Sequence, residues 1–510
     1  MYGDSMLNMN STLREITSEK LTVDHLAALQ TATNALRGEQ FRASAGEGEG
    51  ELLRNLFAAL SRLGVDVQLL LEETSSREDL SLCLKTTAEC FRGLRNACVR
   101  CPHNQSFLRD QGSIKLSFEI LAKLLQTSPE ASSDSSEGEC GPEDSEESTG
   151  EELILSLSLS LSLSFFPLAA LRCGVQFLGN VSVGNQLCKD DVWQFGSPQI
   201  FWDLLQLPDE KSVAYTCMVI HTCLDDQKTA ELVDDVKVSL KIMELCRSLP
   251  AVDWTVLIAT QHFFKSSELI RRMYIEMTDE ERLALLELIL AQLGVAEEQR
   301  AGLIPLSIAH FLASCFTDHC RDVLTLGSDH QEAALVVVRL LEVLCEMTSD
   351  CKEFMALQDH SDLLSTTVDL LKEVDSMGKT SRNVFTAAHD FCLTSPEGAD
   401  ACPAHSVKAH LIRLIGNLCH RHVLNQDKVR EMDGIALILD NCCIDSKNPF
   451  ISQWAVFALR NILEHNQENQ KLIQGLRRQG LADDTLVRDM GFRVEERDGS
   501  LLLRCLKKDP

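Results

Sequence analysis

The stretch HLIRLIGNLCHRHVLNQDKVREMDGIALILDNC, residues His410 to Cys442, combines two apolar helical segments with a distinctive use of asparagine. Asn417 lies near the end of the first segment, and an Asn-Gln pair follows eight residues later, at Asn425 and Gln426. Val429 comes three residues after the pair, and the second apolar segment begins soon afterwards. This order of features decides the fold, because it occurs elsewhere in the chain.

The same arrangement is found at three further places. One copy begins at Asn461, 44 residues after Asn417, and another at Asn96, each with its Asn-Gln pair eight residues later. A partial copy begins at Asn180, with its pair only five residues away. A period in the low forties on apolar helical segments is typical of armadillo and HEAT repeats, whose units have about 40 to 47 residues. The sequence therefore predicts an all-α fold, an armadillo/HEAT-like α-solenoid.

The composition agrees with a solenoid. The chain has 510 residues, 45% of them hydrophobic, and this length exceeds the size at which one compact core keeps growing. A solenoid avoids that limit because it grows by adding units. Only 3 Tyr and 4 Trp are present, while Leu, Ala, Glu and Asp occur in runs at helical spacing, which favours helices over strands.

We expect four parts along the chain. They are an N-terminal helical region with the first armadillo repeats (1–127), an acidic, low-complexity Leu-Ser insert (128–166), central armadillo-like repeats (167–400), and C-terminal armadillo repeats with an association region (401–510). The last part ends in GFRVEERDGSLLLRCL, which predicts a small β-hairpin that turns on Asp498-Gly499, with Val494 and Leu501 to Leu503 in its strands.

The insert is unlike its neighbours. From Thr127 to Gly150 it is too polar to compensate the entropy of ordering, so we predict disorder. Ser136 and Ser148 each precede an acidic residue by three positions, which makes them candidate phosphorylation sites for an acidophilic kinase. The run LSLSLSLSLS, Leu155 to Ser164, alternates with the period of a strand. We favour a microsatellite expansion within a solvated loop or tether over a membrane span, because half the run is serine and a span needs about 20 apolar residues.

The net charge of -28 argues against nucleic-acid binding, which depends on clustered Lys and Arg. The first residues lack the basic and apolar regions of a secretory signal, so we expect the 20 cysteines to be thiols. Cys98 and Cys101 resemble half a zinc site, but the repeat register aligns Cys98 with Cys419, at an apolar packing position. We interpret a second group, Cys315, His319 and Cys320, as core residues in the same way. No metal or other cofactor is expected.

An enzyme would need a catalytic motif, and the sequence has no phosphate-binding glycine loop, no metal-binding His-Glu pair on a helix and no nucleophile elbow. We therefore predict a protein without catalytic activity. An alternative is a nuclear-transport or other peptide-binding armadillo adaptor. Importin-type proteins hold peptides between ladders of Trp and Asn, with the Trp one helical turn before the Asn. The positions four before the repeated asparagines are instead Arg92, Gln176, Arg413 and Phe457.

The repeated asparagines Asn96, Asn180, Asn417 and Asn461 have two interpretations. A side-chain amide can bind the backbone of an extended peptide, because it both donates and accepts hydrogen bonds. It can equally satisfy the backbone groups at a helix end, where the eight-residue interval would span the turn between two repeats. We favour the structural interpretation and keep the four residues as candidate peptide-binding or repeat-ladder positions.

Several segments resemble the ataxin-10 family of vertebrate armadillo-repeat proteins. They are CFRGLRNAC, LRCGVQFLGN, RLLEVLCEMT, HLIRLIGNLC and DGIALILDNC followed by NPFISQW. The resemblance extends from about Leu80 to Leu503 and is strongest from His410 to Ile473, which the association domain of the family occupies. The acidic and Leu-Ser segments depart from the family pattern.

The resemblance implies a non-enzymatic cytoplasmic and perinuclear adaptor that self-associates. It also implies support of neuron survival and neurite outgrowth through the G protein β subunit and Ras to MAP-kinase signalling, and binding to O-GlcNAc transferase. Roles in cytokinesis and at the centrosome, cilium base and midbody, with a polo-like kinase as partner, belong to the same implication. No nucleic acid or membrane is expected as a partner.

Overall fold

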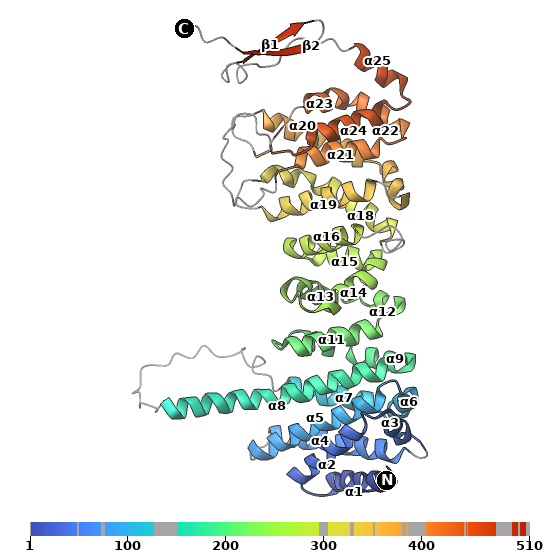
Figure 1. Cartoon of the computed structure of the whole chain (residues 1–510), viewed down its shortest axis with the longest axis vertical. Coiled ribbons are helices and arrows are strands. Elements are labelled where there is room, and N and C mark those ends of the chain that lie inside the picture. Colours follow the sequence, from blue (N-terminus) through green and yellow to red (C-terminus); the bar gives the residue numbers. More distant parts are fainter. Residues whose placement is uncertain are drawn as a thin grey trace. The chain divides into compact units, whose positions relative to one another are not determined.

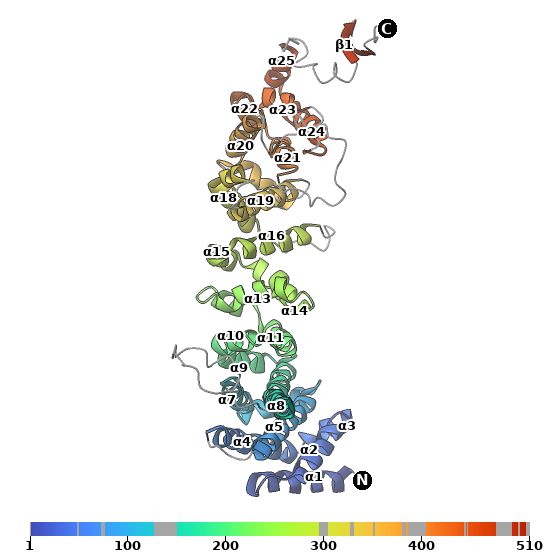
Figure 2. The ribbon, with the colours of Figure 1, turned by 90° about the vertical axis from the view of Figure 1, so that its left-hand side faces the viewer.

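The structure is a computed structural model. It describes residues 2–47, 50–72, 77–126, 150–294, 304–326, 331–349, 352–379, 384–385, 404–442, 445, 447–475, 492–497 and 500–505. The chain divides into two compact units, Met1–Leu363 and Leu364–Pro510. Helices dominate both units, which confirms the predicted all-α solenoid (Figures 1 and 2).

The first unit is built from α-helices and three short 3₁₀ helices. Its elements are α1 (Tyr2–Ser18), α2 (Val23–Ala35), α3 (Glu39–Ala45), α4 (Glu51–Glu72), α5 (Arg77–Cys98), α6 (Pro102–Asp110), α7 (Ser113–Leu125), α8 (Gly150–Ser182), α9 (Gln186–Gly196), α10 (Gln199–Leu205), α11 (Glu210–Cys223), α12 (Asp226–Glu231), α13 (Lys237–Ser248), α14 (Asp253–Gln261), η1 (Phe263–Lys265), α15 (Ser267–Glu276), α16 (Asp279–Leu293), α18 (Leu306–His319), η2 (Cys320–Thr325), α19 (Glu332–Thr348) and η3 (Lys352–Asp359).

The second unit follows the same plan and ends in two strands. Its elements are α20 (Leu363–Gly378), α21 (Val407–Leu418), α22 (Val423–Glu431), α23 (Gly434–Asp440), α24 (Ile451–Leu463), α25 (Gln467–Gly475), β1 (Phe492–Arg497) and β2 (Ser500–Cys505). The strands pair antiparallel, with Val494 opposite Leu503 and Arg497 opposite Ser500, which confirms the predicted hairpin pairing. The predicted turn residues, Asp498 and Gly499, lie outside the described residues.

Equivalent helices of successive repeats pack against one another. In the first unit α5 contacts α8, α8 contacts α11 and α11 contacts α14, and in the second unit α21 contacts α24 (Figure 1). Gly416 permits the last contact, since a Cβ atom there would lie 2.9 Å from the Cα atom of Ala458. Successive repeats therefore share one continuous core within each unit, as a solenoid requires.

The Leu-Ser run differs from the prediction. Helix α8 begins at Gly150 and includes Leu155 to Ser164, so the prediction of a solvated loop or tether is wrong for this run. Leu is a strong helix former, serine costs only part of a kcal/mol per residue, and extending an existing helix avoids the cost of nucleation. Figure 1 shows α8 extending past α5 and α11, which flank it. The predicted disordered segment before it, with Ser136 and Ser148, lies outside the described residues.

None of the helices that the structure describes is long and apolar enough to span a membrane.

Candidate functional site

The repeated asparagines occupy equivalent positions in the fold. Asn96, Asn180 and Asn461 each lie two residues before the end of α5, α8 and α24, and Asn417 lies one residue before the end of α21. The predicted register of the repeats is therefore confirmed. We call these four residues, together with Asn34 near the end of α2, the amide ladder.

Three of these asparagines join two repeats. Asn96 Nδ2 donates a hydrogen bond to the carbonyl oxygen of Thr33 at 3.0 Å. Asn180 Nδ2 donates to Arg95 O at 3.2 Å, and Asn461 Nδ2 donates to Gly416 O at 2.9 Å. The three acceptors have one property in common, because each is the residue directly before a ladder asparagine of the preceding repeat. This regularity places Asn34, whose own side chain is exposed, at the equivalent position of the repeat before α5.

The glutamine of the Asn-Gln pair also joins two repeats, because its side chain reaches carbonyl groups of its own repeat and of the next one. Gln105 Nε2 lies within hydrogen-bond distance of Cys98 O at 3.3 Å, at the end of its own repeat's helix. It also reaches Asn180 O at 2.9 Å and Val183 O at 3.0 Å, in the next repeat. We call this arrangement the glutamine clamp. It satisfies carbonyl groups that a helix end leaves without an intrahelical partner.

The second clamp repeats the first almost atom for atom. Gln426 Nε2 lies 3.2 Å from Cys419 O, 2.9 Å from Asn461 O and 3.3 Å from Glu464 O. The third copy is different, since Gln470 is exposed and its Nε2 donates to Leu463 O at 2.8 Å, at the end of α24 in its own repeat. Among the described residues it makes no hydrogen bond to a following repeat.

The asparagine of each pair caps the same helix end. Asn104 Nδ2 donates to Ala97 O at 2.9 Å, Asn425 Nδ2 to Leu418 O at 2.9 Å, and Asn469 Nδ2 to Ile462 O at 3.0 Å. Every acceptor is the residue after a ladder asparagine. The eight-residue interval thus places the side-chain amides of the Asn-Gln pair within hydrogen-bond distance of the last carbonyl groups of the preceding helix.

In the four copies that have an Asn-Gln pair, the turn before the pair has one residue in the left-handed backbone region. This residue lies four positions after the asparagine in all four copies, and φ is 51° at Arg100, 54° at Arg421, 57° at His465 and 74° at Gly184. Only one of the four is glycine, so residue type alone does not mark the turn. The register of the repeats marks it instead.

The ladder side chains are used within the fold. Asn96 is 6% exposed, Asn417 4% and Asn461 3%, and the Nδ2 groups of Asn96 and Asn461 already donate to backbone carbonyl groups. Asn96, Asn180 and Asn461 therefore bond the preceding repeat rather than their own Asn-Gln pairs. Peptide binding by Asn96, Asn180, Asn417 and Asn461 stays a prediction.

The short-spaced copy departs from this pattern. Asn185 accepts a hydrogen bond from Cys188 N at 3.2 Å and so serves as the N-cap of α9. Gln186 contacts Asp190 Oδ1 at 2.9 Å and Asp225 Oδ2 at 3.4 Å instead of helix carbonyls. The loss of three residues from the interval therefore converts a C-terminal cap into an N-terminal one.

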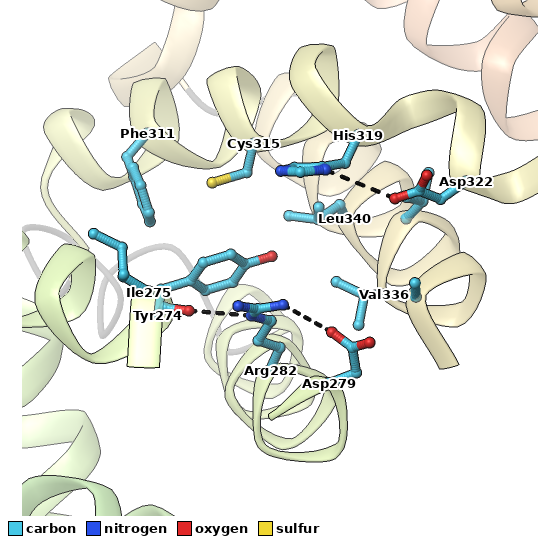
Figure 3. Close-up of a pocket in the computed structure, with 12 residues that line it drawn as sticks. Tyr274, Ile275, Asp279, Arg282, Phe311, Cys315, His319, Asp322, Val336 and Leu340 are labelled. Carbon is cyan, nitrogen blue, oxygen red and sulfur yellow. Dashed lines mark hydrogen bonds and ion pairs between the residues drawn. The ribbon is translucent and has the colours of Figure 1, made fainter. Parts of the chain in front are cut away.

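A pocket of about 300 Å³ lies among α15, α16, α18 and α19 of the first unit (Figure 3). Figure 3 shows the Tyr274 side chain directed into it, between Cys315 and Arg282. Arg282 donates from Nε to Tyr274 O at 3.1 Å and from Nη1 to Asp279 Oδ1 at 2.8 Å. The arrangement offers an apolar body with a few polar groups, which suits binding.

The protonation states in this pocket do not favour nucleophilic chemistry. Burial raises the pKa of Cys315 to about 12 and raises the pKa of Tyr274 above its ordinary value. Both groups are therefore protonated and uncharged near neutral pH, whereas a catalytic thiol needs a lowered pKa.

The cysteines that resembled metal ligands lie in different surroundings. Cys98 and Cys419 are both fully buried, as the repeat register predicted, and burial raises the pKa of each thiol. Cys320 is buried too, but Cys315 is partly exposed at the pocket and the His319 side chain is 67% exposed. The interpretation of His319 as a core residue is wrong, because it lies in the last turn of α18 and faces solvent beside Asp322.

The second unit exposes several large apolar side chains. Leu424 on α22 is 75% exposed, Phe450 at the start of α24 is 69% exposed and Val456 on α24 is 65% exposed. On the same helix Trp454 is only partly exposed, and its ring lies 4.7 Å from the Arg413 guanidinium. Exposed apolar side chains of this size are typical of surfaces that bind another protein.

Comparison with known proteins gives consistent matches. A family model described as "Spinocerebellar ataxia type 10 protein domain" matches residues 407–504. The chain is 39% identical to ataxin-10 of Xenopus tropicalis over 472 residues, 91% of this chain and 89% of that protein. It is 34% identical to ataxin-10 of Homo sapiens over 493 residues, 96% of each chain.

More distant relatives match shorter segments. The ataxin-10 homolog of Dictyostelium discoideum is 46% identical over 87 residues, 17% of this chain and 14% of that one. Among solved structures, an engineered protein aligns over 89% of this chain and 98% of its own with 14% identity and a TM-score of 0.30, which is too low to relate the two folds.

Proposed function

This chain belongs to the ataxin-10 family, and from that premise we propose that it is a non-enzymatic armadillo-repeat scaffold that binds other proteins and self-associates through its second unit. The solenoid supplies the means, because stacked repeats expose a long surface on which several partners can bind. The raised pKa of Cys315 is consistent with a role in binding rather than catalysis.

The last glutamine clamp carries the self-association proposal. Gln105 and Gln426 each hold a following repeat, whereas Gln470, in the same position, is exposed and bonds only the end of α24, in its own repeat, among the residues that the structure describes. An open repeat end needs a cover. The exposed Phe450 and Val456 lie on the helix before it, and the family model matches the same region. A second copy of the chain is the cover that we propose.

Sedimentation velocity on the full chain tests this proposal. Val456→Glu places a charge on the exposed face of α24 and should shift the protein from a larger species towards the monomer. Val65→Glu, at a valine of α4 that is 52% exposed, makes the same change in charge outside this region and should leave the association unchanged. A chain that ends at Ala409 should be monomeric. Unchanged association in both the Val456→Glu and the shortened chain would move the interface elsewhere.

The finer functions follow from the family resemblance. We propose that the scaffold contributes to neuron survival and neurite outgrowth through the G protein β subunit and Ras to MAP-kinase signalling, and binds O-GlcNAc transferase. We also propose a polo-like kinase as partner in cytokinesis and at the cilium base, with a cytoplasmic and perinuclear location. Binding of each purified partner to the full chain, measured by calorimetry, tests the assignments one by one. A partner that does not bind at concentrations of about 10 µM would be removed from the proposal.

A further inference from the structure

Helix α16 has more apolar surface than its neighbours cover. Its sequence, DEERLALLELILAQL, has leucines around much of its circumference rather than along one stripe. One set is buried: Leu285, Leu286, Ile289 and Leu293. Leu283, Leu288 and Leu290 are only partly buried. A helix that is apolar all round is expected to be covered all round. The surplus leucines therefore indicate a surface that another chain covers.

A hollow of about 540 Å³ lies over part of these leucines. It is formed by the end of α13, by α16 and by the first turn of α19, all in the first unit. Leu283, Ala284 and Leu288 of α16 and Leu335 of α19 make its apolar lining, and we call this hollow the α16 groove. Its volume falls in the range of about 300 to 1,000 Å³ that is typical of ligand sites.

The edge of the α16 groove is predominantly acidic. Glu280, Glu287 and Glu332 lie around it, together with Arg247. Arg247 forms an ion pair with Glu280, and both side chains are 50% exposed. A pair this exposed costs little to rearrange. Glu287 is 61% exposed and lies 3.3 Å from Arg339 of α19. Displacing Arg247 and Arg339 would let the carboxylates of Glu280 and Glu287 face an incoming positive charge, beside that of Glu332.

We propose that the α16 groove binds a positively charged amphipathic helix of a partner protein. Apolar side chains one helical turn apart would contact Leu283, Leu288 and Leu335, as in other complexes in which a helix occupies a groove. Lysine or arginine side chains of that helix would lie over the apolar rim with their charges next to Glu280, Glu287 and Glu332. This assignment of a partner class rests on the proposed scaffold function.

A designed peptide serves as the probe. It is a fluorescein-labelled helix of about 14 residues, with leucine at positions i, i+3, i+4 and i+7 and lysine at most others, and its binding to the full chain is followed by anisotropy at about 0.15 M salt. We expect saturable binding, and binding at least about tenfold weaker for a peptide in which glutamate replaces lysine, since like charges then meet at the rim. Equal binding of the two peptides would overturn the proposal.

Two pairs of variants localise the binding. Leu288→Lys should weaken the lysine peptide at least about tenfold, because a charge enters the apolar lining. Leu187→Lys makes the same change at a leucine of α9 that is 58% exposed, and should alter binding less than about twofold. Because Leu288→Lys could disturb folding, a second variant carries Glu287→Lys and Glu332→Lys, both at exposed positions. Its control carries Glu19→Lys and Glu78→Lys, also exposed, with the same change in net charge.

The outcomes separate this proposal from the scaffold proposal. If both groove variants bind the lysine peptide as tightly as their controls do, the peptide binds elsewhere and the α16 groove is not its site. Sedimentation of the same variants reports on self-association through the second unit, which neither groove variant should change. A groove that fails while self-association persists would leave the scaffold function standing.

Discussion

Two groups of repeats satisfy the backbone groups at their helix ends in opposite ways. One group contains α5–α8 and α21–α24, and the other extends from α11 to α16. In the former, Gln105 and Gln426 donate hydrogen bonds to carbonyl groups at helix C-termini. In the latter, side chains accept hydrogen bonds at helix N-termini: Asp209 from Ser212 N, Asp225 from Lys228 N, Ser266 from Leu269 N and Thr278 from Glu281 N. The first method leaves a signature that is easy to recognise in sequence, because amides recur at fixed spacing. The second uses residues that are common at any helix start.

Removing a clamp should have the largest effect. Gln426→Leu fills a similar volume but withdraws the donor from two buried carbonyl groups and one half-buried one, and we expect a loss of about 2 to 4 kcal/mol in the free energy of unfolding. Gln470→Leu is the matched control, because that side chain is exposed and bonds only Leu463 O among the described residues. It should cost less than about 1 kcal/mol. Urea unfolding followed by circular dichroism measures both, and equal losses would mean that the clamp contributes nothing beyond an ordinary helix end.

The clamps also show how far the sequence could predict this fold. Asn96, Asn417 and Asn461 were placed correctly because all three elements of the pattern are present. Asn34 was missed because an arginine replaces the amide eight residues later. Arg42 Nη1 lies 3.4 Å from Leu36 O and 3.3 Å from Arg37 O, so it reaches the same helix end with different chemistry. A search for amides does not find a guanidinium with the same task.

Other features could not be predicted for different reasons. The left-handed turns at Arg100, Arg421 and His465 carry no glycine, so only an alignment of the repeats reveals them. The Leu-Ser run has the period of a strand, yet it continues a helix whose later part is packed between α5 and α11, and that tertiary contact overrides the local pattern. The α16 groove depends on which leucines remain uncovered, and a sequence alone does not specify this.

The N-terminal caps of the central repeats should depend on pH. Asp209 accepts hydrogen bonds from Arg172 and from Ser212, and the Arg172 guanidinium lowers the pKa of this carboxyl group to about 2 against the opposing effect of burial. Because the pKa is depressed in the folded state, the stabilisation is present above the ordinary value of about 3.9 and is lost as the pH falls towards 2. Asp209→Ala should cost about 1 to 2 kcal/mol at pH 6 and much less near pH 2.

Asp209→Asn separates the charge from the cap. Asparagine is an equally good N-cap but cannot be protonated in this range. The difference in unfolding free energy between the wild type and Asp209→Asn, measured by urea unfolding at pH 6 and pH 2.5, should therefore shrink as the pH falls. A difference that stays constant would show that the Arg172 ion pair adds no stability to this repeat.

The capping box at the start of α16 should contribute less to stability than the Asp209 cap, because the Thr278 hydroxyl group is uncharged and the box is exposed to solvent. Thr278 Oγ1 accepts from Glu281 N at 3.3 Å, and Glu281 Oε2 accepts from Thr278 N at 2.7 Å. Thr278→Ala should lower the unfolding free energy by about 1 kcal/mol. Thr278→Ser retains the hydroxyl group and should recover most of that loss. If serine is no better than alanine, the hydrogen bond is not what stabilises the start of this helix.

Substitutions in the turns after the amide ladder should have the smallest effects on stability. Two variants separate the backbone strain of the folded state from the conformational freedom of the unfolded chain. Gly184 has φ of 74° with nothing within 4 Å of a Cβ atom built on it, so Gly184→Ala introduces backbone strain without a steric clash and should cost about 1 kcal/mol. Arg421 already bears that strain at φ of 54°. Arg421→Gly relieves it but gives the unfolded chain more freedom, which costs about 0.4 to 1 kcal/mol, so the net change should stay within about 0.5 kcal/mol. Thermal unfolding of both variants measures the two terms. A gain of about 1 kcal/mol or more for Arg421→Gly would show that the left-handed turn, and not the clamp beside it, limits the stability of this junction.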